Sequence, residues 1–497
     1  MKIQFQLIYQ AIILIYTYQI LQKWLNLCIC FEYLSIILLY SIHNTYLFGI
    51  NYRKQIFRCI NIKNTIYMKI PTNFWKLFYM NSILMMHLSL CLALTALLPQ
   101  IAEQNGYVDL GNYSILAIYM AEFFFNILSP AYLKNRKFNI AFTFQALLVV
   151  PSFFASDYLT NCRNGDDSTW ICKPQILSPI SIIFTFILGA GLGGYFVVQN
   201  YYVSQCATAE SSEIMFSTTY ILMGLSSMLS GFYSKLMLKL VSRSTFFWVT
   251  GFIELGLSML FLFIQTPQKT EMLMSGAKVN DSEIERETNT KEDSIKQNIL
   301  DMYKVFLDKS TYIYYPLFWM TGVIIGFEYG LLYQFINKSL EKNNYDEQTI
   351  NEKTAEVYLF VGIAQTFGAL INGIIKKTLK SQTSIALYTN LLGIIVILAL
   401  VESFIDSFKI IIVLGFFLGL ADISGQFNSA ITISEQYKDA LPVYGIYFCF
   451  QNLSIALVII QATQLEYVHL GYNLFLIGIS QIVVNLAMHY VNRKQAE

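Results

Sequence analysis

The feature that most constrains this chain is a series of long apolar runs that contain almost no charged residues. Twelve such runs follow one another between residues 75 and 491. An α-helix needs about 20 apolar residues to cross the hydrocarbon core of a bilayer, and each run has roughly that length. Only 13% of all residues are charged, whereas roughly 25% are charged in soluble domains. We therefore predict an all-α polytopic membrane protein.

The predicted membrane helices form two groups of six. Between the groups, residues 266–311 are hydrophilic, alternate in charge and contain no aromatic residue before Tyr303. This composition is typical of a solvated linker. We therefore expect a six-helix bundle at 72–265, a cytoplasmic linker at 266–311 and a second six-helix bundle at 312–497. The helices are expected at 75–99, 111–133, 138–156, 177–202, 213–236, 244–265, 313–337, 354–376, 384–403, 408–431, 441–462 and 470–491.

The first 71 residues contain two further apolar segments, 3–22 and 25–50. Neither is followed by a small-residue cleavage site, which argues against a removed signal peptide. Two interpretations stand open. The segments form an extra helical hairpin, or they belong to an upstream extension of the gene model, with Met68 or Met80 as the true start.

The predicted outside loops contain two kinds of candidate modification site. Cys162 and Cys172 flank a polar loop, and they are either joined in a disulfide or present as two free thiols. Asn337-Lys-Ser and Asn112-Tyr-Ser match the glycosylation triplet, and Asn337 is the stronger candidate because Asn112 lies nearer the bilayer. The sequence does not distinguish the plasma membrane from an endomembrane.

Short motifs occur in a characteristic order between residues 72 and 491. They are Asn73 to Tyr79, then Tyr119 with Ser129 and Pro130, then Gly189, Gly191, Gln199, Tyr202 and Ser204, then Gly415, Gly419, Asp422 and Gln426, and finally Phe450 to Leu453. Together with the layout of six helices, a loop and six helices, they resemble the major facilitator superfamily, and in particular its UNC-ninety-three-like branch, the ion channel regulatory protein family.

This resemblance implies a major-facilitator-like fold of two six-helix bundles with 12 transmembrane helices. It implies transport of a small solute by rocking of the two halves about a site between them. Some members of the branch act instead as accessory subunits of potassium channels. The alternative function is therefore a non-transporting regulatory subunit of a channel or another membrane complex.

Enzymatic chemistry finds little support in the sequence. None of the 4 histidines is placed at metal or triad spacing with another candidate, so we read them as interfacial or structural and expect no metal site. The Gly-x-Gly at 189–191 lies inside an apolar helix, so it is a packing feature. We expect no cofactor, and the net charge of +1 gives no case for nucleic-acid binding.

Four acids fall inside predicted membrane helices, where a carboxylate costs at least ~2.5 kcal/mol on insertion scales. We expect them to face the bundle interior, with Glu254 nearer a helix end than the others. Side-chain amides occur at comparable depth. One interpretation is a polar central cavity with titratable acids, and the other is a set of hydrogen bonds that only tie helices together. The candidates for a substrate or proton pathway are Asp422, Glu122, Glu328, Gln426, Gln199, Asn200, Gln451 and Asn452.

The predicted helix interiors contain almost no Lys or Arg. A pocket that grips phosphate or carboxylate usually presents such residues, so we expect a neutral or cationic solute rather than an anion. Five aromatic residues near the expected cavity are candidates to stack on a cation. They are Phe196, Tyr201, Tyr202, Phe416 and Phe427.

A row of small residues marks one side of the predicted helix 213–236. It consists of Ser217, Gly224, Ser227 and Gly231. In lipid, small residues let helices approach closely, because hydrophobic burial does not drive association there. This face either packs inside the protein or binds a partner such as a channel subunit.

Overall fold

The computed structural model describes residues 71–464, apart from 108, 134–135, 164–168, 209, 268–294, 342–346, 379–390, 393, 396–397, 400–406 and 438. The chain divides into two compact units, Met1–Ile70 and Pro71–Glu497. The first unit, with the apolar segments 3–22 and 25–50, lies outside the described residues, as do the predicted helix 470–491 and most of 384–403. The fold below is that of the second unit.

Six long helices make up the N-terminal half of this unit. They are α2 (Phe74–Gln104), α3 (Leu110–Leu133), α4 (Phe138–Asn161), α5 (Pro174–Cys206), α6 (Ser212–Leu240) and α7 (Arg243–Leu260), and α7 continues into a short 3₁₀ turn, η3 (Phe261–Phe263). Local signals set their ends. Pro174 occupies the first turn of α5, where a missing amide donor costs nothing. Ser242 caps α7 by accepting a hydrogen bond of 3.2 Å from the Thr245 amide.

The described part of the C-terminal half is also helical. Its elements are α11 (Tyr315–Gly326), the π-helical turn η4 (Phe327–Leu331), α12 (Leu332–Glu341), α13 (Glu347–Thr378), α15 (Phe408–Gln436) and α16 (Ala440–Gln464). In all, 10 helical spans of the described chain are long and apolar enough to cross a membrane. The prediction of an all-α, multi-pass integral membrane protein is therefore confirmed. Asn337 lies within α12 and not in a loop.

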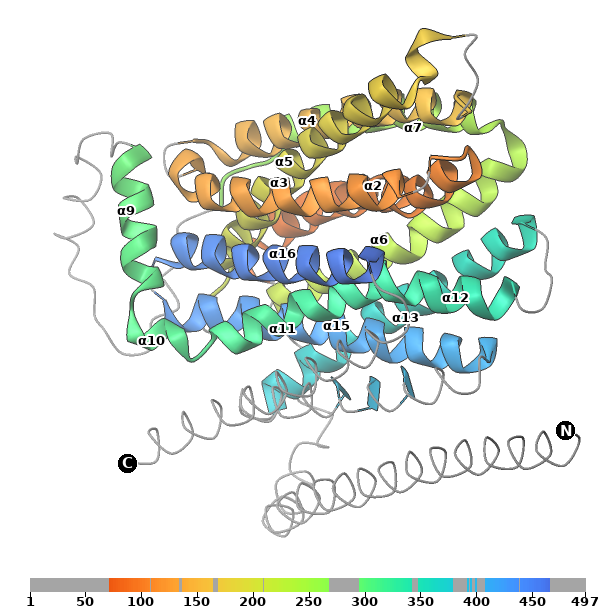
Figure 1. The fold of residues 1–497 in the computed structure, drawn as a ribbon. Coiled ribbons are helices and arrows are strands. Elements are labelled where there is room, and N and C mark those ends of the chain that lie inside the picture. The colour runs from red at the N-terminus through yellow and green to blue at the C-terminus, as the bar shows by residue number, and fades with distance from the viewer. Residues whose placement is uncertain are drawn as a thin grey trace, which may run out of the picture. The chain divides into compact units, whose positions relative to one another are not determined.

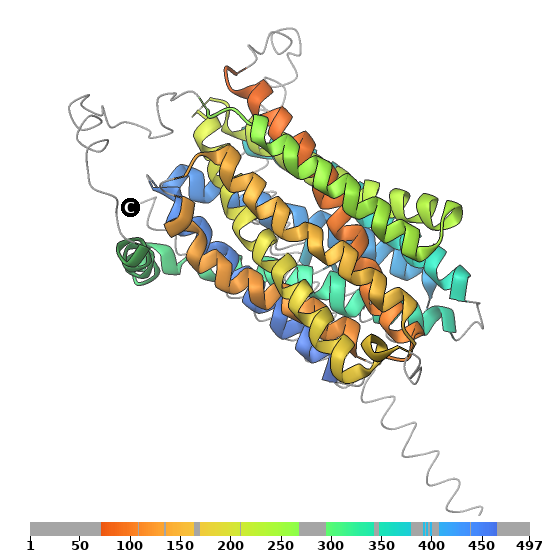
Figure 2. The same ribbon diagram turned by 90° about the horizontal axis from the view of Figure 1, so that it is seen from above.

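The predicted linker is partly helical. Residues 295–306 form α9 (Ile295–Phe306), and α10 (Lys309–Tyr312) follows it. Ile295, Ile299, Met302 and Phe306 recur at helical spacing, which gives α9 an apolar side. Met302 is buried against Ile446 and Cys449. The long helices of the unit run side by side, and α9 crosses them at one end (Figures 1 and 2). Counting charges alone misses this amphipathic helix.

The two halves meet where glycines remove side-chain bulk. A Cβ on Gly224 of α6 would lie 2.5 Å from the Thr366 nitrogen of α13, and one on Gly362 of α13 would lie 2.6 Å from the Met228 nitrogen of α6. Ser217 donates a hydrogen bond of 3.1 Å to the Ala369 carbonyl of α13. The small-residue face of α6 therefore packs inside the protein.

A second contact between the halves joins α3 and α16. A Cβ on Gly445 of α16 would lie 2.8 Å from Cγ of Pro130 and 3.0 Å from the carbonyl oxygen of Asn126, both in α3. The two contacts pair one helix of each half with one helix of the other. Side chains from several helices surround the space between these two contacts.

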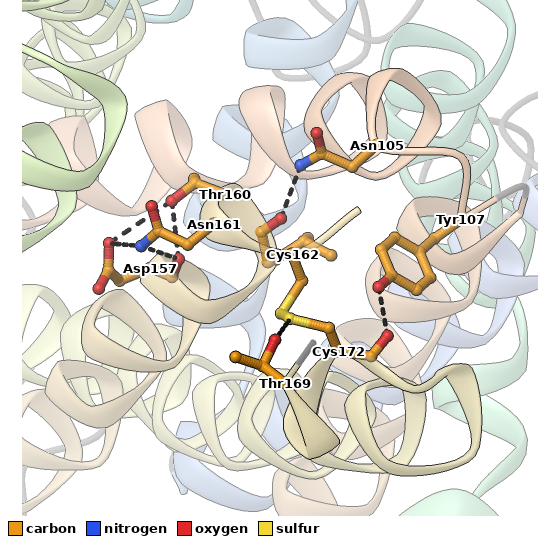
Figure 3. The surroundings of a disulfide bond; sticks show 9 residues. Asn105, Tyr107, Asp157, Thr160, Asn161, Cys162, Thr169 and Cys172 are labelled. Carbon is orange, nitrogen blue, oxygen red and sulfur yellow. Dashed lines mark hydrogen bonds between the residues drawn. A yellow bond between two sulfur atoms is a disulfide. The ribbon is translucent and has the colours of Figure 1, made fainter. Parts of the chain in front are cut away.

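A disulfide between Cys162 and Cys172 closes the connection from α4 to α5 (Figure 3). The Tyr107 hydroxyl donates a hydrogen bond of 2.6 Å to the Cys172 carbonyl, and Asn105 donates one of 2.7 Å to the Leu159 carbonyl. These bonds tie the α2–α3 connection to the disulfide-bearing connection at the same end of the bundle.

We predict that Gly224→Leu destabilises the protein by about 1–3 kcal/mol, the usual cost of overpacking. The added side chain would meet the backbone of α13, which has no room to yield. The measurement is thermal unfolding in detergent, followed as the monodisperse fraction. Gly256→Leu is the matched control, because a Cβ there has no neighbour within 4 Å. Equal unfolding temperatures for the two variants would contradict the prediction.

We also predict that Cys162 and Cys172 resist alkylation until the protein is reduced, since their sulfur atoms are bonded to each other. Peptide mapping after alkylation with and without reductant measures this directly. Cys91, Cys206 and Cys449 are free thiols and serve as the internal comparison under unfolding conditions. Replacing both bonded cysteines by serine should lower the free energy of unfolding by up to about 3 kcal/mol, because the unfolded chain is then no longer restricted by the cross-link.

Candidate functional site

A cavity of about 120 Å³ lies between the two halves. Its lining comes from α2, α3, α5 and α6 on one side and from α11, η4, α13, α15 and α16 on the other. Five of the eight pathway residues predicted from the sequence line it. They are Glu122, Asp422, Gln426, Gln451 and Asn452.

Asp422 of α15 is held by two amide donors. Gln365 of α13 donates a hydrogen bond of 2.8 Å to Oδ2, and Gln426, one turn along α15, donates one of 2.7 Å to Oδ1. Both donors also line the cavity. Hydrogen bonds to each oxygen fix the orientation of the carboxylate and compensate its burial. The carboxylate is thus pre-oriented at the cavity wall.

Glu122 faces the cavity from α3, in the other half. Asn452 of α16 interacts with its carboxyl group, although Asn452 Nδ2 closes no hydrogen bond of good geometry with any described residue. Nearby, Gln451 donates a hydrogen bond of 3.3 Å to the Tyr447 hydroxyl. Asn452 therefore places an amide from one half beside the carboxyl group of the other half, at the cavity wall.

The cavity combines acidic and aromatic groups. Among the described residues that line it, Glu122 and Asp422 have carboxyl groups and none is Lys, Arg or His. Four aromatic side chains also contribute to the wall: Tyr119, Phe196, Tyr329 and Phe448. Of the five aromatic residues named from the sequence, only Phe196 is among them. This lining favours positive charge and apolar surface in a ligand.

Three predicted pathway residues lie outside the cavity lining. Gln199 donates a hydrogen bond of 3.2 Å to Asn81, and Asn200 accepts one of 3.1 Å from the Tyr220 hydroxyl. These two amides join helices of the N-terminal half. Glu328 is buried in η4, where its charge interacts with that of Asp422 and its Oε2 has no hydrogen-bond partner among the described residues.

Sequence reasoning missed one pair of ionisable groups. His87 of α2 and Glu254 of α7 contact each other through Nδ1 and Oε1, and both side chains are fully buried. His87 is therefore not interfacial, and Glu254 is deep in the bundle. The two residues are 167 positions apart. The only sequence signal for their contact is that each is an ionisable residue in an apolar helix.

Comparison with known proteins places this architecture. No curated protein shows significant sequence similarity to the chain. A crystal structure of a bacterial homologue of the iron transporter ferroportin, in an outward-facing state with soaked iron, superposes with a TM-score of 0.58 at 10% identity, covering 84% of this chain and 99% of that one. A crystal structure of a D-xylose-proton symporter gives a TM-score of 0.55 at 13% identity, covering 84% and 97%.

At such identities these likenesses concern the fold alone. The sequence supplies the stronger evidence, because the family model of the Major Facilitator Superfamily matches residues 170–459, more than half of the chain. The matched region begins before α5 and ends within α16, so it includes helices of both halves. The chain therefore belongs to the Major Facilitator Superfamily.

Proposed function

We propose that this protein transports a small neutral or cationic solute across a membrane by alternating access, with the solute bound in the central cavity. The observation that carries the proposal is the composition of that cavity. Both halves contribute to its lining, two carboxyl groups face it from opposite halves, and no basic residue belongs to its described lining. Membership in the superfamily and the transporter folds of the structural neighbours support membrane transport.

The contacts between the halves suit a rocking motion. α6 packs on α13 and α3 packs on α16 through glycine positions, where smooth backbone surfaces meet. Interfaces of this kind permit two rigid bundles to tilt against each other while the site stays between them. The cavity would then open to one side of the membrane at a time.

We propose that Asp422 couples this cycle to protons. A protonated carboxyl group gains an O–H donor, and its hydroxyl oxygen is a weaker acceptor than a carboxylate oxygen. Gln365 and Gln426 both donate to Asp422, so protonation would weaken one of these two hydrogen bonds. Because Gln365 belongs to α13 and Asp422 to α15, that change would alter a contact between two helices.

The finer family assignment is also a proposal. The motif order between residues 72 and 491 supports placement in the UNC-ninety-three-like branch. The regulatory-subunit alternative came from the family resemblance, and the small-residue face of α6 was its candidate partner surface. That face is occupied by α13, which leaves the transporter interpretation with the more specific structural support.

The proposed neutral or cationic character of the solute rests on the cavity of this chain. One of the two neighbouring structures was soaked with iron, and the other is that of a D-xylose-proton symporter. Those ligands belong to those proteins. Here, Tyr119, Phe196 and Phe448 beside two carboxyl groups suit an organic cation or a neutral solute with apolar surface.

We predict that Asp422→Asn leaves the protein folded and lowers proton-driven uptake to background. The asparagine side chain has nearly the size of the aspartate side chain, but it cannot take up a proton. Uptake by proteoliposomes with an inward proton gradient, using a labelled panel of sugars and small organic cations, is the measurement. Glu210→Gln, at an exposed position outside the cavity, is the control. Unchanged uptake by Asp422→Asn would remove the coupling role.

We further predict that Glu122→Gln weakens transport of cations more than transport of neutral solutes. Replacing one of the two carboxyl groups of the cavity removes a group that, once ionised beside a bound cation, attracts only a cation. The measurement is the ratio of cation to neutral-solute uptake in the same proteoliposomes, where we expect a decrease of about tenfold, equivalent to about 1.4 kcal/mol of binding. A ratio equal to that of the unsubstituted protein would contradict it.

A further inference from the structure

The buried pair His87–Glu254 lies outside the set of residues that line the cavity, and the proposed transport step does not use it. The imidazole comes from α2 and the carboxylate from α7, and neither is exposed. Ionisable groups in the interior of a membrane bundle are expensive and usually serve a function. This pair therefore needs an explanation of its own.

Stability alone explains the pair poorly. Replacing a buried ion pair with apolar residues of similar volume is often neutral or stabilising, because desolvation costs as much as the attraction returns. Around the imidazole, Tyr195 and Phe261 already provide ring contacts at 5.0 Å and 5.9 Å between centroids. An apolar residue at position 87 would keep such packing between the helices.

One polar atom of the pair and one polar atom next to it have no hydrogen-bond partner among the described residues. They are Oε2 of Glu254 and the hydroxyl of Tyr195, whose ring stacks on His87. A proton added to Oε2 would break no existing hydrogen bond. The fold therefore does not fix the number of protons on the pair, which is what a site of reversible proton binding requires.

Cys91 connects the pair with the cavity. Its sulfur lies 3.9 Å from Nε2 of His87, one helical turn away on α2. Cys91 also belongs to the cavity lining, and its thiol interacts electrostatically with both Glu254 and Glu122. His87 thus presents one ring nitrogen to Glu254 and the other to a side chain that borders the cavity.

The ionisable surroundings of the imidazole are few. From the elements packed on α2, Glu254 of α7 and Tyr195 of α5 face the ring, Cys91 lies on α2 itself, and Glu122 of α3 acts through Cys91. In the described part of the chain, no ion pair joins the imidazole or Glu254 to a charged side chain of α4 or α6. Protonation of the pair therefore depends mainly on its two members and on access from the cavity.

We propose that His87 and Glu254 form a proton-binding site of the N-terminal half, separate from Asp422, that exchanges protons with the cavity through Cys91. One proton moves and no electron does. The thiol passes its hydrogen to Nε2 of a neutral imidazole and regains one from the cavity side, and the imidazole shares the Nδ1 hydrogen with Glu254. Its role in transport rests on the function proposed above, but proton binding itself needs no solute.

Infrared difference spectroscopy on the full-length protein in lipid, titrated between low and high pH, tests the site. We expect a titrating carboxyl band that Glu254→Gln abolishes and that His87→Asn moves to a different midpoint. Glu328→Gln is the matched control, because it removes another buried carboxyl group and should leave this band in place. A spectrum in which Glu254→Gln removes no titrating band, or in which His87→Asn leaves the midpoint unchanged, would overturn the proposal.

The route through Cys91 is tested by the rate at which that band responds to a pH jump. Cys91→Ala should slow the response about tenfold or more. Cys91→Ser supplies a hydroxyl that can relay a proton in place of the thiol, so its response should be nearly as fast as that of the unsubstituted protein. Equal rates in all three proteins would exclude Cys91. If either single variant of the pair fails to fold, the double variant His87→Asn/Glu254→Gln keeps a hydrogen-bonded pair without a titrating proton. The double variant must lack the band. Because this result is read from the spectrum alone, it is independent of whether the protein transports a solute.

Discussion

Close approach of helix backbones at glycine positions is the constraint on which the rest of this structure depends. Inside a bilayer, apolar side chains gain nothing by leaving lipid for protein, so packing contacts and hydrogen bonds must hold the helices together. Gly193 of α5 shows the consequence, since a Cβ there would lie 2.7 Å from the Cα of Glu122 in α3. The position of a cavity carboxyl group is thus set by the absence of a side chain on the next helix.

The same close packing divides the buried polar groups into two kinds. Gln199 donates to Asn81, and Asn372 donates a hydrogen bond of 2.7 Å to Ser424, in each case across helices within one half. These pairs act as interhelical ties of modest energy, about 0.6 kcal/mol each on average. Asn452 of α16, by contrast, lies beside Glu122 of α3 in the cavity lining, at the interface between the halves. The amides of this second kind therefore lie where a solute between the two bundles would contact them.

Each half of the unit has covalent, hydrogen-bonding or ionic contacts of its own away from the cavity. At one end, the disulfide and the hydrogen bonds of Asn105 and Tyr107 join neighbouring loops of the N-terminal half. Within the C-terminal half, Lys376 of α13 and Glu435 of α15 form an ion pair of 2.7 Å. Each half thus has its own internal ties. The α6–α13 contact between the halves combines close glycine packing with the hydrogen bond of Ser217 and an ion pair of 3.7 Å between Lys239 and Glu352.

The sequence by itself determined the class of fold, the helix positions and most of the cavity acids. Apolar runs of membrane length and the charged break after residue 265 are local properties, so α2 to α7 begin and end close to the predicted residues. Asp422 and Glu122 stood out because a carboxyl group in an apolar helix is conspicuous. The helix α9 escaped because its sequence follows directly on a run of alternating charges and reads as part of the same solvated linker.

Only the tertiary structure decided which polar groups meet. Gln365 and Asp422 are 57 positions apart, and His87 and Glu254 are 167 apart. Their encounters depend on how each helix is rotated about its axis, which is fixed by backbone contacts such as those of Gly224 and Gly445. A residue pattern shows that a helix has a polar side, but the neighbour of that side is set by the packing of the whole bundle. For this reason Gln199 and Asn200 proved to be ties, while Gln365 and Cys91 proved to border the cavity.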